Sequence, residues 1–254
     1  MFSACRLSLS TLLFACLYWP ALNSSATPLP EYTILRSAGP IAIDGLLDEP
    51  SWQYNQPVHP FIFPWWQEGE KEPTYARLLW DDSNLYISFI AFDKNISATL
   101  TERDSPVSRD DCVEVFFAPD PGAVDIYFNF EFNALGTILD RSPREQRSSK
   151  WNGQGVQVAV QIDGTLNDES DSDRQWNTEI AIPWTAIAPY APSLPPLPGQ
   201  SWRLNLYRIG GQINPQYSVW SDTETPKPQY HAPARFGIVV FSEAEVPVPQ
   251  RKKE

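Results

Sequence analysis

Two carboxylates of this chain, Glu114 and Glu131, lie within apolar segments where an ionised side chain is unusual. Glu114 interrupts Cys112–Ala118, a run rich in Val and Phe that is expected to form a buried strand. Burying a carboxylate without a partner is costly. Glu114 therefore either pairs with a base such as Arg103 or Arg109, or it opens onto a wet, functional surface.

Residues 126–133 alternate between apolar and polar side chains, which predicts a strand with one core face and one polar face. The core face holds Ile126, Phe128, Phe130 and Phe132, and the polar face holds Tyr127, Asn129, Glu131 and Asn133. This polar face is either simply solvated or part of a binding surface. If the strand lies beside 112–118, Glu114 and Glu131 form a carboxyl pair, and a separation of about 5 to 10 Å is what glycoside hydrolysis requires.

Aromatic side chains are more numerous than a core of this size needs, with ten Trp and ten Tyr. Exposed Trp and Tyr often line binding surfaces. Trp65 and Trp66, next to a proline and a charged stretch, are candidates for an exposed platform, and Tyr230 on a proline-flanked loop is expected to be exposed. Four other tryptophans lie in strand or packing motifs and are expected in the core: Trp52, Trp80, Trp184 and Trp202.

Length and composition favour one domain built from strands. The chain has 254 residues, 42% of them hydrophobic, with 25 prolines and 12 glycines. Many prolines between short apolar runs are typical of strands and ordered loops. The net charge of −12 argues against nucleic acid as a partner, because phosphate contacts need a basic surface.

The N-terminus reads as an export signal covering residues 1–26. Arg6 precedes an apolar stretch at 7–19 that is shorter than the roughly 20 residues of a spanning helix, and small residues at 24–26 suit a cleavage site. Lipoprotein processing at Cys16 is the alternative, and it is the one route by which the chain would meet a membrane. We therefore expect an exported protein, secreted or periplasmic, or lipid-anchored at the cell envelope if Cys16 is modified.

Short apolar runs separated by turn residues, with no long amphipathic helix, predict an all-β, immunoglobulin-like antiparallel β-sandwich. The candidate strands are 32–36, 75–80, 85–92, 112–118, 126–133, 137–141, 156–162, 176–182, 202–208, 217–220 and 235–241. Short helical turns are expected at 48–54, burying Trp52, and at 184–187. We predict a single domain at 30–241 and an unstructured polar tail at 242–254.

Cysteine and acidic residues suggest little metal chemistry beyond calcium. Cys112 is the one cysteine outside the export signal and is expected to be a small buried hydrophobe. Acidic clusters at 81–82, 110–111 and 168–173 offer hard oxygen ligands that suit calcium, or they are solvated turns.

An ordered set of motifs carries a resemblance over nearly the whole chain after the signal. The motifs are Ile43-Asp44-Gly45, Leu79-Trp80-Asp81-Asp82, Asp110-Asp111-Cys112-Val113-Glu114-Val115-Phe116-Phe117, Glu131-Phe132-Asn133, Glu179-Ile180-Ala181-Ile182-Pro183-Trp184, Trp202-Arg203-Leu204-Asn205-Leu206-Tyr207-Arg208, Trp220-Ser221-Asp222 and Phe236-Gly237. In this order they resemble the family 9 carbohydrate-binding modules and their wider relatives, a β-sandwich group related to DOMON domains.

The resemblance implies sugar binding without catalysis by the module, and structural calcium. Family members hold a glycan end between two aromatic rings while polar residues contact its hydroxyls. The strand glutamate of the family matches Glu114, and one stacking tryptophan matches Tyr230. The second stacking tryptophan corresponds to Ser108 and a neighbouring arginine corresponds to Glu131, so this chain departs from the pattern at both positions. Trp65, Trp66 or Trp151 could supply a missing ring.

The expected function is therefore an exported, non-catalytic protein that binds a polysaccharide or oligosaccharide and aids glycan degradation by separate hydrolases, since some relatives are fused to xylanases. One alternative is a haem-binding, electron-transfer module of the DOMON type, for which His59 and His231 would have to serve as axial ligands. The other is a glycoside hydrolase that uses Glu114 and Glu131.

Overall fold

The protein, seen in a computed structural model that describes residues 27–145, 150–191 and 193–249, folds as one continuous sheet of eleven strands. The predicted signal peptide, including Cys16, lies outside these residues. The strands are β1 (Glu31–Arg36), β2 (Thr74–Trp80), β3 (Asn84–Phe92), β4 (Cys112–Ala118), β5 (Phe128–Asn133), β6 (Ile138–Arg141), β7 (Gln157–Asp163), β8 (Gln175–Pro183), β9 (Ser201–Gly210), β10 (Gln216–Val219) and β11 (Gly237–Glu245). The helical pieces are α1 (Pro50–Tyr54), α2 (Trp184–Ile187) and three 3-10 turns at Val107–Arg109, Ala188–Tyr190 and Pro233–Arg235.

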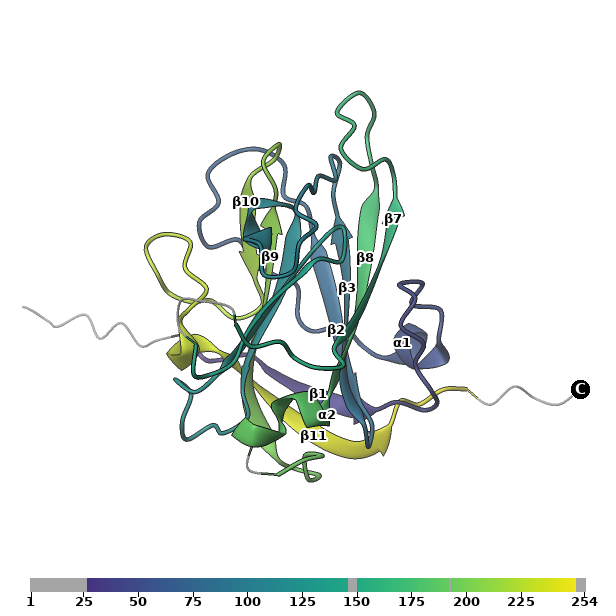
Figure 1. Cartoon of the computed structure of the whole chain (residues 1–254), viewed down its shortest axis with the longest axis vertical. Helices are drawn as coiled ribbons and strands as arrows, with labels where there is room; N and C mark the ends of the chain where they lie inside the picture. The colour runs from purple at the N-terminus through teal and green to yellow at the C-terminus, as the bar shows by residue number, and fades with distance from the viewer. Residues whose placement is uncertain (1–26, 146–149, 192, 250–254) are drawn as a thin grey trace, which may run out of the picture.

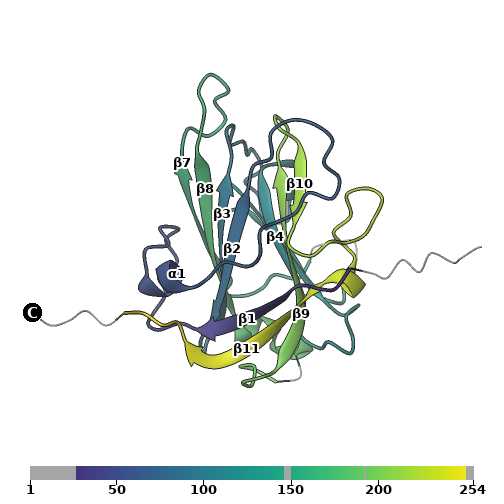
Figure 2. The same ribbon diagram turned by 180° about the vertical axis from the view of Figure 1, so that it is seen from behind.

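The sheet curls into two facing layers, which confirms the predicted all-β sandwich. The strand order is β6-β5-β4-β9-β11-β1-β2-β3-β8-β7, and β10 pairs with β9. Strands β2, β3, β8 and β7 form one layer, β9, β4, β5 and β6 form the other, and β1 with β11 closes the lower end (Figures 1 and 2). Pairing is antiparallel except at β1, which runs parallel to both β11 and β2.

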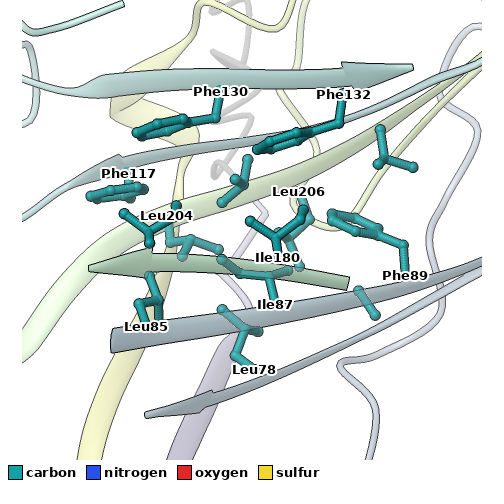
Figure 3. Close-up of a cluster of buried hydrophobic side chains, with 14 of the residues drawn as sticks. Leu78, Leu85, Ile87, Phe89, Phe117, Phe130, Phe132, Ile180, Leu204 and Leu206 are labelled. Atoms are coloured by element: carbon teal, nitrogen blue, oxygen red, sulfur yellow. The ribbon is translucent and has the colours of Figure 1, made fainter. Parts of the chain in front are cut away.

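The core fills the space between the layers with the residues that alternation predicts. Figure 3 shows Phe117, Phe130, Phe132, Leu204 and Leu206 of one layer facing Leu78, Leu85, Ile87, Phe89 and Ile180 of the other. The four tryptophans expected in the core, Trp52, Trp80, Trp184 and Trp202, are all buried. Burial on this scale is the main source of stability, because each large apolar side chain contributes about 1.5–3 kcal/mol.

Two expectations about the ends of elements are wrong. Ile126 lies before β5 in a turn and is 51% exposed, because the strand begins only at Phe128. The first residues of the expected tail belong to β11, which continues to Glu245 because its backbone pairs with β1, and Val246 is buried. Both helical turns form as expected, and α1 buries Trp52.

Candidate functional site

The face of β4, β5 and β9 that points away from the core gathers the predicted site residues. Val113, Val115 and Phe117 of β4 belong to the core, so Glu114 and its even-numbered neighbours point outward. The register places Glu131 of β5 on one side of Glu114 and Tyr207 of β9 on the other. This outer face has an apolar cluster of its own, made of Phe116, Tyr207, Val219, Tyr230 and Phe236.

Glu114 and Glu131 are direct register partners, and both are nearly buried, at 2% and 5% exposure. Side chains directly opposite each other have Cβ atoms about 4.5–5.5 Å apart. Burial raises the pKa of Glu114 well above its ordinary value, and the neighbouring Glu131 raises it further, against the opposing effect of Arg141. The expectation that the two carboxyl groups lie on adjacent strands is confirmed.

Asn129 and Arg141 both contact the same oxygen of Glu131, Oε1. Asn129 Nδ2 donates a hydrogen bond to Glu131 Oε1 at 3.2 Å, and the Arg141 guanidinium lies 3.7 Å from the same oxygen. Burial raises the pKa of Glu131, and Asn129, Arg141 and the Ser108 hydroxyl offset part of this rise. The second oxygen, Oε2, is buried and accepts no hydrogen bond from the described residues. The polar face of β5 is therefore covered rather than solvated.

Glu114 faces a cavity of about 190 Å³ on the outer face. Within the described part of the chain, no side chain or backbone group donates a hydrogen bond to its carboxyl group, and no base forms an ion pair with it. Arg103 instead pairs with Asp140, and Arg109 is exposed, so of the two alternatives for Glu114 the pairing with Arg103 or Arg109 does not form. The cavity is lined by Ser108, Glu114, Glu131, Ile209, Tyr217, Pro228, Gln229, Tyr230 and His231.

Tyr230 lines this cavity with Glu114, but the expectation that its ring is exposed is wrong. It is only 7% exposed, because it stacks on Tyr207 at 4.2 Å between ring centroids. Its hydroxyl donates to the backbone oxygen of Arg208 at 2.8 Å, while the Tyr207 hydroxyl donates to the backbone oxygen of Tyr230. Tyr230 therefore forms a fixed wall of the cavity.

Two aromatic residues at the cavity were missed as site residues by sequence reasoning. Tyr217 of β10 is 38% exposed and packs edge-on against Tyr230 at 6.4 Å. His231 is exposed, lies against Phe116 at 5.0 Å, and shares a hydrogen bond of 2.8 Å with the Tyr127 hydroxyl. The available signal was weak: Tyr217 alternates with polar residues on a short strand, and His231 directly follows Tyr230.

Trp65 and Trp66 lie beside the cavity rather than in it. They line an adjoining groove of about 680 Å³ that shares Tyr217 and Pro228 with the Glu114 cavity. Trp65 stands 6.1 Å from Tyr230 and donates from Nε1 to the backbone oxygen of Thr225 at 2.7 Å. The segment before β2, which carries both tryptophans, passes next to β10 in both views and bridges to it at Ile62–Val219 (Figures 1 and 2).

Trp151 lies elsewhere. Its ring packs against Phe128 and Phe130 at 5.5 and 5.8 Å, and both of these belong to the core. It therefore supplies no ring to the outer face.

The comparison with known proteins decides the family. The sequence profile described as carbohydrate-binding family 9 matches residues 62–241. The chain belongs to this family.

Solved structures share the fold of this chain at low sequence identity. A candidate carbohydrate-binding protein from Bacteroides uniformis is 22% identical, with a TM-score of 0.70 over 85% of this chain and 100% of that one. A family 9 module from Caldicellulosiruptor kristjanssonii in complex with cellotriose is 15% identical, with a TM-score of 0.60 over 88% and 100% of the two chains. The same kind of module in complex with glucose is 13% identical, with a TM-score of 0.60 over 88% and 98%. No curated protein matches the chain.

Two carboxylates of the acidic clusters of this family 9 domain, Asp81 and Asp111, accept several hydrogen bonds from the chain. Asp81 accepts from the backbone of Ser83 and Asn84 and from the Tyr86 hydroxyl. Asp111 accepts from Ser97, Gly211 and Arg208. Within 27–145, 150–191 and 193–249, no three His, Cys, Asp or Glu side chains stand together as metal ligands.

The histidines give no support to the haem alternative. His231 lies at the Glu114 cavity, whereas His59 is an exposed residue of the segment after α1 and lines neither this cavity nor the tryptophan groove.

Cys112 is buried, as expected, and burial raises the pKa of its thiol well above the ordinary value. None of the helices in the described part of the chain has the length and apolar character needed to cross a membrane.

Proposed function

We propose that this family 9 domain binds a saccharide unit in the Glu114 cavity and that further units lie in the groove of Trp65 and Trp66. The observation that carries the proposal is the pairing of Glu114, buried yet without a hydrogen-bond donor, with Tyr230 in the lining of one cavity. A carboxyl group that lines a cavity and receives no donor from the protein can accept hydrogen bonds from a ligand, and a sugar hydroxyl would supply that donor.

The chemistry of the lining suits a sugar. Carboxyl groups accept hydrogen bonds from hydroxyls, and charge-assisted bonds of this kind are roughly twice as strong as neutral ones. Tyr217 and His231 offer exposed ring faces against which the C–H side of a sugar ring can pack, with Tyr230 behind them. Glu114 would therefore orient the sugar, and the rings would supply contact area.

The length of the combined surface favours an oligosaccharide over a single sugar. The cavity of about 190 Å³ holds little more than one ring, whereas the adjoining groove of about 680 Å³ has room for more. The structural neighbours include modules bound to cellotriose and to glucose. We take a β-glucan such as cellotriose as the first ligand to test.

The proposal extends to the place of action. The predicted signal peptide at 1–26 supports export, and a binding domain outside the cell would hold polysaccharide for separate hydrolases. Mass spectrometry of the mature N-terminus would check this, since export by simple cleavage leaves Thr27 first and lipoprotein processing leaves a lipid on Cys16.

Isothermal titration of the purified domain with cellotriose and glucose tests the proposal. We expect dissociation constants in the millimolar to micromolar range, tighter for cellotriose, and a loss of at least about tenfold in Glu114→Gln, which is about 1.4 kcal/mol. Glu169→Gln is the matched control, because Glu169 is an exposed carboxylate on the β7–β8 loop. Binding that Glu114→Gln leaves unchanged would move the site elsewhere, and absence of binding to any saccharide would refute the function.

A further inference from the structure

Building on the proposed function, we propose that the saccharide in the Glu114 cavity carries a protonated amine, as a glucosamine oligosaccharide does, and that the ammonium group lies between the carboxylates of Glu114 and Glu131. A neutral sugar needs one or two acceptors for its hydroxyls. Two carboxyl groups that are register partners and line the same small cavity offer more acceptors than a neutral sugar requires.

The hydrogen bonding of the pair leaves room for a cationic donor. Glu131 Oε2 is buried without a donor among the described residues, and the Glu114 carboxyl receives none. An ammonium group has three donors and a full positive charge, so it satisfies both carboxylates at once. A hydroxyl has one donor and no charge, and it leaves their mutual repulsion in place.

The charged groups around the pair leave it acidic. Arg141 of β6 lies 3.7 Å from Glu131, donates to Asn129 Oδ1 and lines a different cavity, so its single positive charge offsets only part of the charge of the two carboxylates. The other titratable groups facing the pair are the Cys112 thiol of β4, the Tyr207 hydroxyl of β9, and Tyr217, Tyr230 and His231 at the rim. Burial raises the pKa of Cys112, Tyr207 and Tyr230, and burial lowers that of His231, so these four add no positive charge near neutral pH.

The aromatic rim is suited to the same ligand. Tyr217, Tyr230 and His231 line the cavity together with the two carboxylates. Aromatic faces attract cations within about 6 Å, and such contacts are stronger when the cation loses water. The chain as a whole is acidic, with a net charge of −12, which favours approach of a polycationic saccharide.

Binding of a cation should release a proton. Burial raises the pKa of both carboxyl groups, and repulsion by Glu131 raises that of Glu114 further, so an ammonium ion placed between them would displace any proton that the unliganded pair holds. Affinity should therefore fall at acid pH, where both carboxyls are protonated, and fall again at alkaline pH, where the amine is neutral. An affinity maximum between these limits distinguishes a cationic ligand from a neutral one.

The test compares three trisaccharides of similar size by isothermal titration at about pH 6 and moderate salt: the glucosamine trimer, its fully N-acetylated form, and cellotriose. We expect the glucosamine trimer to bind at least about tenfold more tightly than the other two, with proton release visible as a dependence of the enthalpy on the buffer. Equal or weaker binding of the glucosamine trimer, with cellotriose bound, would overturn this inference and leave the proposed function standing. No binding by any of the three would refute both.

Variants separate the site from general charge attraction. In Glu131→Gln the ratio of the glucosamine to the N-acetylated affinity should fall to about one, and in the exposed control Glu169→Gln it should stay at the wild-type value. An equal fall in both variants would mean non-specific attraction and would overturn the inference. Circular dichroism checks that each variant folds. If Glu131→Gln does not fold, Glu114→Gln makes the same isosteric change to the other carboxyl group of the pair and takes its place.

Discussion

Glu114 on β4 and Glu131 on β5 face each other as register partners, and both carboxyl groups are buried. Like charges directly opposite in a sheet are destabilising, and burial without donors adds to the effect. A sequence selected for stability alone would not place the pair there. Residues that lower the stability of a fold but are retained are typical of ligand sites. The effect of the pair on stability and its effect on binding can therefore be measured separately.

The first prediction concerns stability and pH. Burial raises the folded-state pKa of Glu114 above its unfolded value, so its contribution is most favourable below the unfolded pKa and is lost as pH rises toward the folded pKa. Relative to Glu114→Gln, wild-type protein should lose free energy of unfolding as pH rises above about 4.5. Urea unfolding from about pH 4 to pH 8 measures the difference. Glu169→Gln, an exposed change of the same kind, should show no such trend, and a pH-independent difference for Glu114→Gln would contradict the prediction.

The second prediction separates a structural tyrosine from a binding one. Tyr230 is buried, stacks on Tyr207 and donates to a backbone oxygen, so Tyr230→Ala should lower the free energy of unfolding by about 3 kcal/mol. Tyr217 is half exposed on the edge strand β10, so Tyr217→Ala should leave stability within about 1 kcal/mol while weakening cellotriose binding about tenfold.

Chemical unfolding and titration on the same two variants check this. Tyr230→Phe, which keeps the ring and loses one hydrogen bond, is the matched control and should lower stability by about 1 kcal/mol. A Tyr217→Ala variant that binds as tightly as wild type would remove this ring from the site.

Much of the fold was predictable because alternation encodes it locally. In β4 and β5 every second residue is a large apolar side chain, and that pattern fixed which face meets the core and which carries Glu114 and Glu131. Strand ends were less predictable. Residues 242–245, with two glutamates, a serine and an alanine, give no strand signal, yet β11 continues through them to Glu245, which pairs with Arg36 of β1.

The site was predictable only in part, because it depends on segments far apart in the chain. That Ser108, Glu114, Glu131 and Tyr230 meet at one cavity followed from the family resemblance and not from any local pattern. The burial of Tyr230 could not be foreseen, since it depends on Tyr207 in another strand. Tyr217 gave only a weak local signal, its alternation with polar residues, and its place at the cavity depends on the pairing of β10 with β9.

The third prediction uses ligand length to test the tryptophan groove. Trp66 lines the groove but not the Glu114 cavity, and its ring contacts Phe63 edge-on at 6.2 Å. Trp66→Ala should weaken binding of cellotriose by several-fold and leave binding of glucose unchanged, because the monosaccharide does not reach the groove. Titration with both sugars measures the two affinities. Equal losses for both would place Trp66 at the primary sugar, and no loss for either would remove the groove from the binding surface.

The fourth prediction concerns the buried cation that fixes the start of β4. Arg208 of β9 points to the core side, is 1% exposed, and pairs with Asp93 at 2.6 Å and with Asp111 at 3.0 Å. Asp111 directly precedes β4, so this contact sets the register that brings Glu114 beside Tyr207. Removing one partner of a buried ion pair leaves the other charge uncompensated, which lowers stability by about 3–5 kcal/mol.

Arg208→Met should therefore destabilise the protein by roughly 3 kcal/mol near neutral pH, and by less at acid pH. Burial already raises the pKa of Asp111 to about 7 with Arg208 in place. Without the guanidinium, protonation of Asp111 removes its uncompensated charge, so the loss should shrink as pH falls. Arg36→Met is the control, because Arg36 pairs with an exposed Asp82 and such surface pairs contribute at most about 1 kcal/mol. Urea unfolding of both variants across pH measures the loss in free energy of unfolding. An equally small loss for Arg208→Met and Arg36→Met would mean that the buried ion pair does not hold β4 in place.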